Sequence, residues 1–387
     1  MRTSPKNKQK KTSAIPLHTP LLLALLCSTA RAEPLEISRQ LAAASAPGIE
    51  LAAEIKSLPT LRKGNNGQSV AKLSQLLAQA GELAVPPSDP LLFGAEHESA
   101  VKRLQARFGL KQDGVAGPVL YANLGSSVGE RQARAERWAF RLEELAHQAR
   151  SEGFGKMVVI NVPTFTLRAI DLDSGKTVVR SAVVVGRPER PTPIGRMHIV
   201  GLKYNPDWTP PEVVLKNDVL PRLGKDAAWF EHHGLLARGP GGVEKSAAEI
   251  TAEEYSAQWR IYQPAGRKNA LGLLKFETDS TENIYLHDTN DRALFANTSR
   301  AKSSGCIRVE RWEELAAFIA DKPGENIRRK VEQGDTVRER VRKTPVYIEY
   351  SLADVTAAGG ELTTVVYPDI YALAESPAQL KTASKEK

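Results

Sequence analysis

The sequence predicts an α+β protein in which a small helical domain precedes a larger, β-rich domain. Apolar residues recur at helical spacing up to about residue 150, and after Gly153 and Gly155 the pattern changes to short β-rich runs separated by turns. The 387 residues, 41% hydrophobic and 25% charged, suffice for two units that each bury a core. This composition excludes a collagen-like repeat, disorder over the whole length and a protein with many membrane spans.

Residues 1–32 have the three-part pattern of a secretory signal peptide, with cleavage expected before Glu33. Basic residues precede the apolar stretch 21–26, which is followed by Ala30-Arg31-Ala32. A bilayer span needs about 20 consecutive apolar residues, so no stable membrane insertion is expected. Loss of the signal removes six basic residues and no acidic one, which leaves 47 basic against 45 acidic residues and a charge of +2. A nucleic-acid partner is therefore not expected.

Cleavage also removes Cys27 and leaves Cys306 as the only cysteine of the mature chain, so no intramolecular disulfide is expected. An unpaired thiol in an oxidising compartment needs an explanation, either as a buried apolar residue or as a reactive one. Cys27 would be a lipid-attachment site in a lipoprotein, but such sites usually follow a small residue, whereas Leu26 stands here.

Helices are expected throughout the first part of the mature chain. Residues 33–56 form a helical N-terminal segment, residues 57–127 form three short helices and residues 128–153 form a helical linker. The turn Gly109-Leu110-Lys111-Gln112-Asp113-Gly114-Val115-Ala116-Gly117-Pro118 resembles that of the small peptidoglycan-binding domain found beside many cell-wall enzymes. From the residues alone, it is a tight Asp-Gly turn in a helical bundle, and a purely structural role stays open.

Residues 154–376 form the β-rich domain, and residues 377–387 form a flexible tail. Strands are expected at 157–162, 165–170, 177–185, 197–203, 273–276, 284–287, 346–350 and 362–367. A long insertion at about 210–264 contains Trp229, Tyr255 and Trp259, which indicate an ordered structure. Long insertions in compact domains are often lids over a site, although this one could also simply pack beside the core.

The candidate catalytic residues are His287, at the end of a predicted strand, and Cys306, which follows it after 18 intervening residues. A thiol with a pKa of about 8.5 is mostly protonated at neutral pH, so a nucleophilic cysteine needs a nearby imidazole or cation. Ser304 and Gly305 leave the approach to sulfur open, and the N–H groups of Gly305 and Cys306 could face an oxyanion. The alternatives are a core histidine, a buried cysteine and an ordinary Ser-Gly turn.

These residues resemble the motif of the L,D-transpeptidases of bacterial peptidoglycan. In that family a strand His is followed by Ser or Thr, a variable residue, Gly, Cys and usually Arg or Asn, which map here to His287, Ser303, Ser304, Gly305, Cys306 and Arg308. Many members have a second His at the variable position, so only His287 is assigned as the base. The resemblance covers roughly residues 154–375 and, with the insertion, is strongest to the large Gram-negative type that carries a capping subdomain.

The resemblance implies that Cys306 attacks a tetrapeptide stem, that His287 protonates the departing D-Ala, and that an amine of a second stem then takes the acyl group in a 3-3 cross-link. It further implies that the backbone carbonyl of Asp288 orients His287 and that Gly305 and Cys306 stabilise the oxyanion. Neither a cofactor nor a metal is implied. The expected partners are donor and acceptor stem peptides, and the expected location is the periplasm, in association with the cell wall.

The remaining assignments to substrate binding each keep a structural alternative. Arg308 would hold a stem carboxylate or, as slightly favoured, brace the cysteine turn. Tyr285 and Trp208 would line the donor groove or pack in the core. Ser303 and Ser304 would contact substrate near the turn, or Ser303 would bond only its own backbone. Trp229 or Trp259 of the insertion would cover a stem peptide.

Four other interpretations compete with this one. A metal hydrolase is not expected, because the adjacent His232 and His233 do not have the spacing of a zinc-binding helix. The basic stretch 328–343 is interspersed with acidic residues and is expected to be a solvated face. An L,D-carboxypeptidase, in which water replaces the amine, and a non-catalytic peptidoglycan-binding protein remain alternatives.

Overall fold

The computed structural model describes residues 35–43, 55, 58–83, 87, 89–255, 259–358 and 361–373. The expected signal peptide, Cys27 and the expected tail at 377–387 lie outside the described residues. Within them, no helix is both long enough and apolar enough to cross a bilayer.

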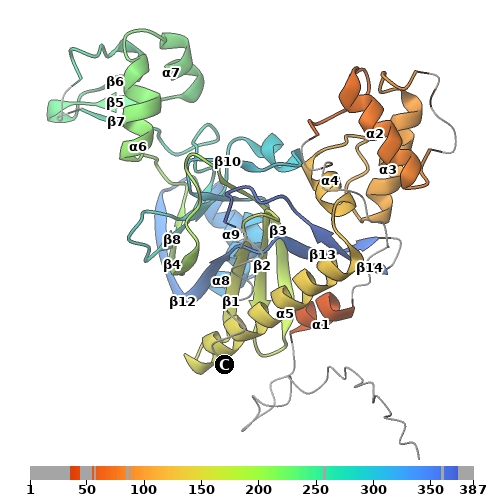
Figure 1. Cartoon of the computed structure of the whole chain (residues 1–387). Coiled ribbons are helices and arrows are strands. Elements are labelled where there is room, and N and C mark those ends of the chain that lie inside the picture. The colour runs from red at the N-terminus through yellow and green to blue at the C-terminus, as the bar shows by residue number, and fades with distance from the viewer. Residues whose placement is uncertain are drawn as a thin grey trace, which may run out of the picture. The chain divides into compact units, whose positions relative to one another are not determined.

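The predicted bundle consists of α2 (Gln68–Gln79), α3 (Ala95–Arg107) and α4 (Pro118–Leu124) (Figure 1). The helical spacing of apolar residues predicts its core, since Val70, Leu73 and Leu104 are fully buried in one cluster. Pro118 occupies the first turn of α4, where a missing N–H costs nothing. The fold-class prediction, a helical domain before a β-rich one, is confirmed.

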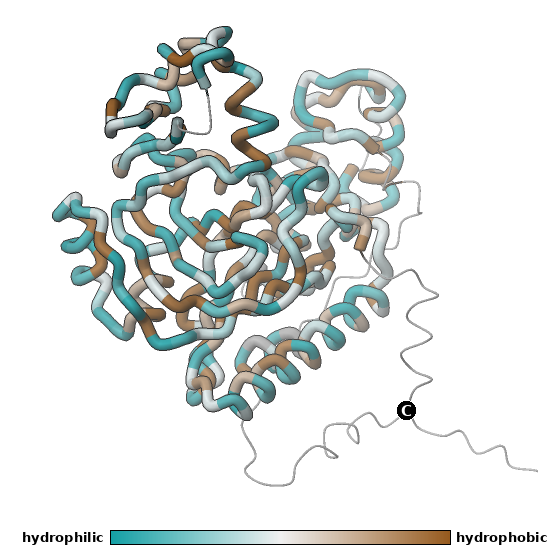
Figure 2. The backbone as a smooth tube through the Cα atoms, turned by 90° about the vertical axis from the view of Figure 1, so that its left-hand side faces the viewer, coloured by the Kyte–Doolittle hydropathy of each residue, from teal (hydrophilic) through white to brown (hydrophobic). Residues whose placement is uncertain are grey.

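The helix expected to link the domains is α5 (Val128–Ser151), and it packs on the β domain. Its Trp138, Leu142 and Leu145 are buried against residues of the sheet. In Figure 2, hydrophobic and hydrophilic residues alternate along its turns, as expected of a helix with one buried face. The N-terminal helix α1 (Glu36–Ala43) lies beside α5 (Figure 1), where Ser38 Oγ donates to Ala139 O at 3.3 Å.

The β domain is built on a nine-stranded sheet in the order β10-β3-β11-β9-β8-β4-β12-β1-β2, and a further pairing of β2 with β3 closes it into a barrel. The strands of this sheet are β1 (Lys156–Asn161), β2 (Thr166–Asp171), β3 (Lys176–Gly186), β4 (Gly195–Tyr204), β8 (Leu274–Thr278), β9 (Leu286–His287), β10 (Ala301–Ser303), β11 (Ile307–Val309) and β12 (Val337–Glu349).

The sequence of strand β1 is a continuous apolar run because both faces of the strand are buried. Alternate side chains of a strand point to opposite faces. Val158 and Ile160 enter the barrel core, whereas Met157 and Val159 pack toward α5 in a second core. Because both faces of the strand are covered, neither selects polar residues.

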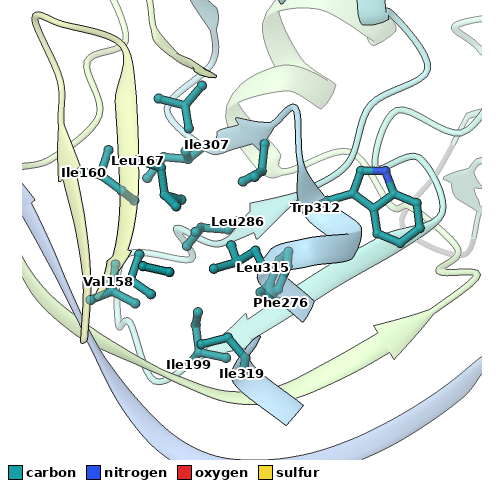
Figure 3. Close-up of a cluster of buried hydrophobic side chains, with 14 of the residues drawn as sticks. Val158, Ile160, Leu167, Ile199, Phe276, Leu286, Ile307, Trp312, Leu315 and Ile319 are labelled. Atoms are coloured by element: carbon teal, nitrogen blue, oxygen red, sulfur yellow. The ribbon is translucent and has the colours of Figure 1, made fainter. Parts of the chain in front are cut away.

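The barrel core is completed by α8 (Trp312–Ala320), which is followed by α9 (Gly324–Glu332). Figure 3 shows Leu315 and Ile319 of α8 among the sheet residues of this core. This helix begins three residues after β11, so its packing fixes the strand that follows the cysteine.

The insertion has its own small core. It contains α6 (Glu212–Val214), α7 (Ala227–His233) and a three-stranded sheet of β5 (Leu236–Arg238), β6 (Glu244–Ser246) and β7 (Arg260–Tyr262). Phe230, Ile250 and Ile261 are buried in it. At its base, Trp208 and Gln263 exchange backbone hydrogen bonds of 2.9 and 2.7 Å.

After β12 the chain forms a hairpin of β13 (Ala353–Ala358) and β14 (Glu361–Val366), of which only the second strand was predicted. The basic stretch 328–343 is divided between α9 and β12. Its acidic neighbour Glu339 is a partner of Lys322 and Lys330. The alternating charges are therefore partly ion-paired and do not form a continuous basic surface.

Candidate active site

Two short strands bring the predicted histidine and cysteine together. Strands β9 and β11 pair in parallel, with Arg308 opposite His287 and Ile307 opposite Leu286. Leu286 and Ile307 are fully buried in the barrel core. By the alternation of a strand, His287 and Arg308 point to the other face. Cys306 precedes Arg308 by two residues and therefore shares this face, as does Tyr285.

His287 has a defined tautomer. Its Nδ1 donates to the backbone oxygen of Asp288, so Nε2 carries the lone pair. Burial, with the nearby Arg308 and then Lys275, lowers the pKa of His287 to about 3, against the opposing bond to Asp288 O. The imidazole is therefore neutral at physiological pH, with Nε2 ready to accept a proton.

The side chain of Asp288 acts on the backbone around it. Its carboxylate accepts from Leu273 N at 3.0 Å and from Arg292 Nη1 at 2.9 Å. A Cβ at Gly272 would collide with this carboxylate, and Gly272 has a φ of +61°. The buried carboxylate thus fixes the segment whose carbonyl orients His287. Its pKa is raised by burial, against the backbone bonds from Leu273 and Thr289.

Cys306 lies at the end of a tight turn before β11. Its sulfur is 3.8 Å from Asn283 O, and the Tyr285 backbone and hydroxyl are hydrogen-bond partners of the sulfur. Burial raises the pKa of the Cys306 thiol, while Tyr285, Lys275 and Arg308 oppose the rise. Thiol and imidazole are thus both neutral at rest, and the ion pair must form during the reaction.

The predicted turn residues hold the loop in shape. The Ser303 hydroxyl donates to Cys306 O at 2.6 Å and accepts from Gly305 N at 3.1 Å, so it is occupied within the turn. Gly305 has a φ of +116°, which favours glycine. Because the Gly305 N–H is already used, the Cys306 N–H is the donor that remains of the two expected for an oxyanion.

Tyr285 connects the thiol to the base of the insertion. Its hydroxyl is a hydrogen-bond partner of both Cys306 and the Trp208 side chain, and burial raises its pKa strongly. Lys275 Nζ lies 3.7 Å from the centre of the Tyr285 ring, a cation–π contact. Tyr285 and Trp208, predicted as groove residues, therefore also support the nucleophile.

Arg308 has unfilled hydrogen-bonding capacity. Nη1 donates to Thr289 Oγ1 at 3.2 Å, whereas the buried Nε has no partner. Among the described residues, no carboxylate forms a salt bridge with Arg308. Lys275 is likewise without a salt-bridge partner in the described ranges. Asp291 acts on Arg308, and Glu277 acts on Lys275, without a salt bridge, so the two cations that flank the thiol have no carboxylate in direct contact among the described residues.

Ser304 is joined to the insertion through Arg190. The Nη1 atom of Arg190 donates to Ser304 Oγ at 3.2 Å and to Asp218 Oδ2 at 2.8 Å. The aromatic residues expected to cover a stem peptide pack inside the insertion. The Trp229 and His233 rings make a tilted contact with 4.3 Å between ring centres, and Trp259 lies against Gly239. Contact between the insertion and the catalytic turn is therefore polar.

The sequence interpretation assigned no role to Lys275, Arg190 or Thr192. Lys275 alternates with the core residues Leu274 and Phe276, so strand periodicity indicates that it faces away from the core. That signal, together with the neighbouring His287 strand, could have identified it. For Arg190 and Thr192, the partners are distant in sequence and no local pattern reveals them.

Comparison with known proteins agrees with this geometry. Residues 155–348 match the family described as "L,D-transpeptidase catalytic domain", and residues 66–124 match the "Putative peptidoglycan binding domain". A "Putative L,D-transpeptidase" of Haemophilus influenzae is 31% identical over 224 residues, which are 56% of this chain and 44% of that protein. The chain thus spans less than half of that relative.

Solved structures are also similar to this chain. An L,D-transpeptidase from Mycobacterium smegmatis is 12% identical, with 50% of this chain and 58% of that chain covered and a TM-score of 0.26. The catalytic domain of the E. faecium L,D-transpeptidase acylated by ertapenem is 13% identical, with 50% and 97% covered and a TM-score of 0.26. The family match over half of the chain includes both His287 and Cys306. The chain therefore belongs to the L,D-transpeptidase family, a family of cysteine enzymes, and carries a peptidoglycan-binding domain before its catalytic domain.

Proposed function

We propose that this protein is a periplasmic L,D-transpeptidase that acylates Cys306 with a tetrapeptide stem, releases D-Ala and transfers the acyl group to an amine of a second stem, forming 3-3 cross-links. One observation carries the proposal. A buried imidazole of fixed tautomer and a thiol in a tight turn share one face of neighbouring strands.

In the acylation half, the Cys306 proton passes to His287 Nε2 as sulfur attacks the donor carbonyl. The Cys306 N–H donates to the resulting oxyanion. The C–N bond to D-Ala then breaks, and the imidazolium returns the proton to the leaving amine. A histidine with a pKa of about 3 is a strong acid once protonated, which favours this second transfer.

In the transfer half, an acceptor amine attacks the thioester and gives up a proton to His287. The C–S bond breaks, the new amide remains, and the thiol regains the proton. Water competes with the amine at this step. The Arg190 contacts to Ser304 and Asp218 support a role of the insertion in limiting that access.

Arg308 and Lys275 are suited to the anionic groups of the donor. A guanidinium fork binds a carboxylate through paired hydrogen bonds. We therefore assign Arg308 to a donor carboxylate, in addition to its bond with Thr289. Peptidoglycan binding by residues 66–124 would keep the enzyme near its polymer.

The direct test is intact-protein mass spectrometry after exposure to a tetrapeptide donor or a carbapenem. The expected result is one covalent adduct on Cys306 in the wild type and none in Cys306→Ala, while both proteins bind peptidoglycan. Adduct formation by Cys306→Ala would refute the assignment of the nucleophile. Binding of peptidoglycan without any adduct or D-Ala release in the wild type would instead indicate a non-catalytic wall-binding protein.

Product masses distinguish the two enzymatic alternatives. A transpeptidase yields cross-linked dimers, whereas an L,D-carboxypeptidase yields trimmed monomers. Trimmed monomers alone, in the presence of a competent acceptor stem, would contradict transpeptidation and leave acylation at Cys306 intact.

A further inference from the structure

The peptide group between Gly305 and Cys306 is held from its carbonyl side. Gly305 O accepts from Thr192 Oγ1 at 2.8 Å. In a trans peptide the C=O and the following N–H point in opposite directions. Holding the Gly305 oxygen therefore fixes the direction of the Cys306 N–H, which is the oxyanion donor of the proposed function.

The direction of the Thr192 hydrogen bond is determined by its other partner. Its Oγ1 also accepts from Gly186 N at 2.9 Å. A threonine hydroxyl has one proton, and this proton is available for Gly305 O. Thr192 is 1% exposed, so no solvent competes for it.

Thr192 is itself held at the end of β3. Its backbone N–H donates to Tyr371 Oη at 3.2 Å, and this hydroxyl donates to Gly186 O at 2.5 Å. A Cβ at Gly186 would lie 2.6 Å from Thr192 N, so the close approach requires glycine. A strand end, a loop and the C-terminal segment thus meet behind the catalytic turn.

We propose that Thr192 is a positioning residue for the oxyanion hole, which acts by clamping the Gly305–Cys306 peptide through the Gly305 carbonyl. The inference rests on the proposed function, because it presumes an oxyanion at Cys306. The residue does not touch the reacting atoms. Its loss leaves the thiol and His287 in place and misdirects one backbone donor.

The test compares two reactions of the same thiol in the full-length protein. Acylation by a carbapenem passes through an oxyanion, whereas alkylation by iodoacetamide displaces iodide at a saturated carbon and forms none. Thr192→Val keeps the shape and removes the hydroxyl, and Thr192→Ser keeps the hydroxyl. We expect Thr192→Val to lower the acylation rate about 100-fold, the size typical for loss of an oxyanion donor, with alkylation unchanged within twofold. Thr192→Ser should recover most of the acylation.

A matched control is Thr177→Val, the same substitution on the neighbouring strand β3, which should acylate like the wild type. If Thr192→Val does not fold, as judged by circular dichroism, Tyr371→Phe serves as the second variant. It removes the hydroxyl that holds Thr192 N, and we expect about a tenfold loss of acylation with normal alkylation.

If Thr192→Val is acylated at the wild-type rate, or if it loses acylation and alkylation equally, the proposal for Thr192 is wrong. The enzyme assignment still stands in either case. If Tyr371→Phe serves as the second variant, acylation at the wild-type rate would likewise contradict the proposal for Thr192. A wild type that forms no adduct with the carbapenem refutes the proposed function itself, so the two failures are distinguishable.

Discussion

His287 is buried next to Arg308 and Lys275, and this environment decides how its proton is handled. A cysteine–histidine ion pair at rest would need an imidazolium, which burial and two cations disfavour. The thiol is also protonated, because burial raises its pKa. The nucleophile is therefore generated only when a carbonyl is in position.

The pH dependence of acylation follows from this environment. Because the pKa of His287 is lowered to about 3, the base form persists well below ~6.5, the ordinary histidine value. We expect the carbapenem acylation rate to stay within threefold between pH 8 and pH 5. The rates are measured by intact mass, and circular dichroism checks the fold at each pH. A tenfold decline centred near pH 6.5 would contradict a buried, neutral His287.

Arg308 is expected to recognise the donor through its guanidinium fork. Arg308→Lys keeps the charge and loses the fork. We expect the KM for a tetrapeptide donor to rise about 10- to 100-fold, the size of a charge-assisted hydrogen bond. A donor whose terminal carboxylate is converted to an amide should show a much smaller difference. Arg311→Lys, which changes an exposed arginine paired with Glu314, is the control. Equal effects on both donors would indicate bracing of the turn.

At the scale of elements, the sequence was most informative where the pattern was long. The period of apolar residues in α2 and α5 predicts both helices, and the run at 157–162 predicts β1. Strand β9 lies within the predicted run 284–287, whereas β10 and β11 are three residues long, too short for periodicity, and were not predicted. The motif predicted His287 and Cys306. Their shared face depends on a β9–β11 register that only long-range packing fixes.

Other misses have a similar cause. The packing of α5 on the sheet was not predicted, because nothing in the local sequence identifies its partner, a sheet surface formed later in the chain. Strand β13 was missed although it forms a local hairpin with β14, whereas closure of the barrel depends on the pairing of β3 with the distant β11. Thr192 has no local signature, since its importance lies in a bond to Gly305. Local propensity thus predicts elements, and topology assembles the site.

The insertion is expected to favour cross-linking over hydrolysis through its polar contact with the catalytic turn. Asp218→Ala removes the carboxylate that holds Arg190 near Ser304. A partly exposed ion pair contributes up to about 1 kcal/mol, so the ratio of hydrolysed to cross-linked product should rise up to roughly fivefold. Lys216→Ala, which disrupts only an exposed pair with Glu212, is the matched control. An unchanged product ratio in Asp218→Ala would argue that the insertion merely packs beside the core.

Helix α3 contains a buried histidine that makes the bundle sensitive to acid. His97 Nδ1 accepts from Gly94 N at 3.3 Å, and Nε2 lies 2.6 Å from Ser74 Oγ. Burial lowers the pKa of His97 relative to the unfolded chain, so protonation favours unfolding as the pH falls below ~6.5. We expect the protection factors of α3 amides, which are exchange rates corrected for the intrinsic effect of pH, to be lower at pH 5.5 than at pH 7.5. This loss of protection should be absent in His97→Asn and retained in His147→Asn, an exposed control. An equal loss of protection in both variants would exclude His97 as the cause.

At the scale of the whole described molecule, residues 35–373 contain four separate hydrophobic clusters within one compact unit. Polar contacts between these clusters hold the parts of the chain that contain them against one another. Asn123, at the end of α4, provides one of them. Its side chain donates to Val366 O at 2.8 Å and accepts from Val366 N at 2.9 Å, so that it pairs with β14 as a neighbouring strand would. The buried amide thus joins the peptidoglycan-binding bundle to the hairpin of the catalytic domain.

Replacement of this amide tests the connection. Asn123→Asp keeps the shape, but a carboxylate cannot donate to Val366 O and would face it unpaired. We expect a loss of about 1–3 kcal/mol in the free energy of unfolding and faster deuterium exchange at the Val366 amide, with β1 amides unaffected. Asn297→Asp, an exposed asparagine whose side chain has no described partner, is the control for the same chemical change. Unchanged exchange at Val366 in a folded Asn123→Asp protein would mean that the bundle and the hairpin are held together by other contacts.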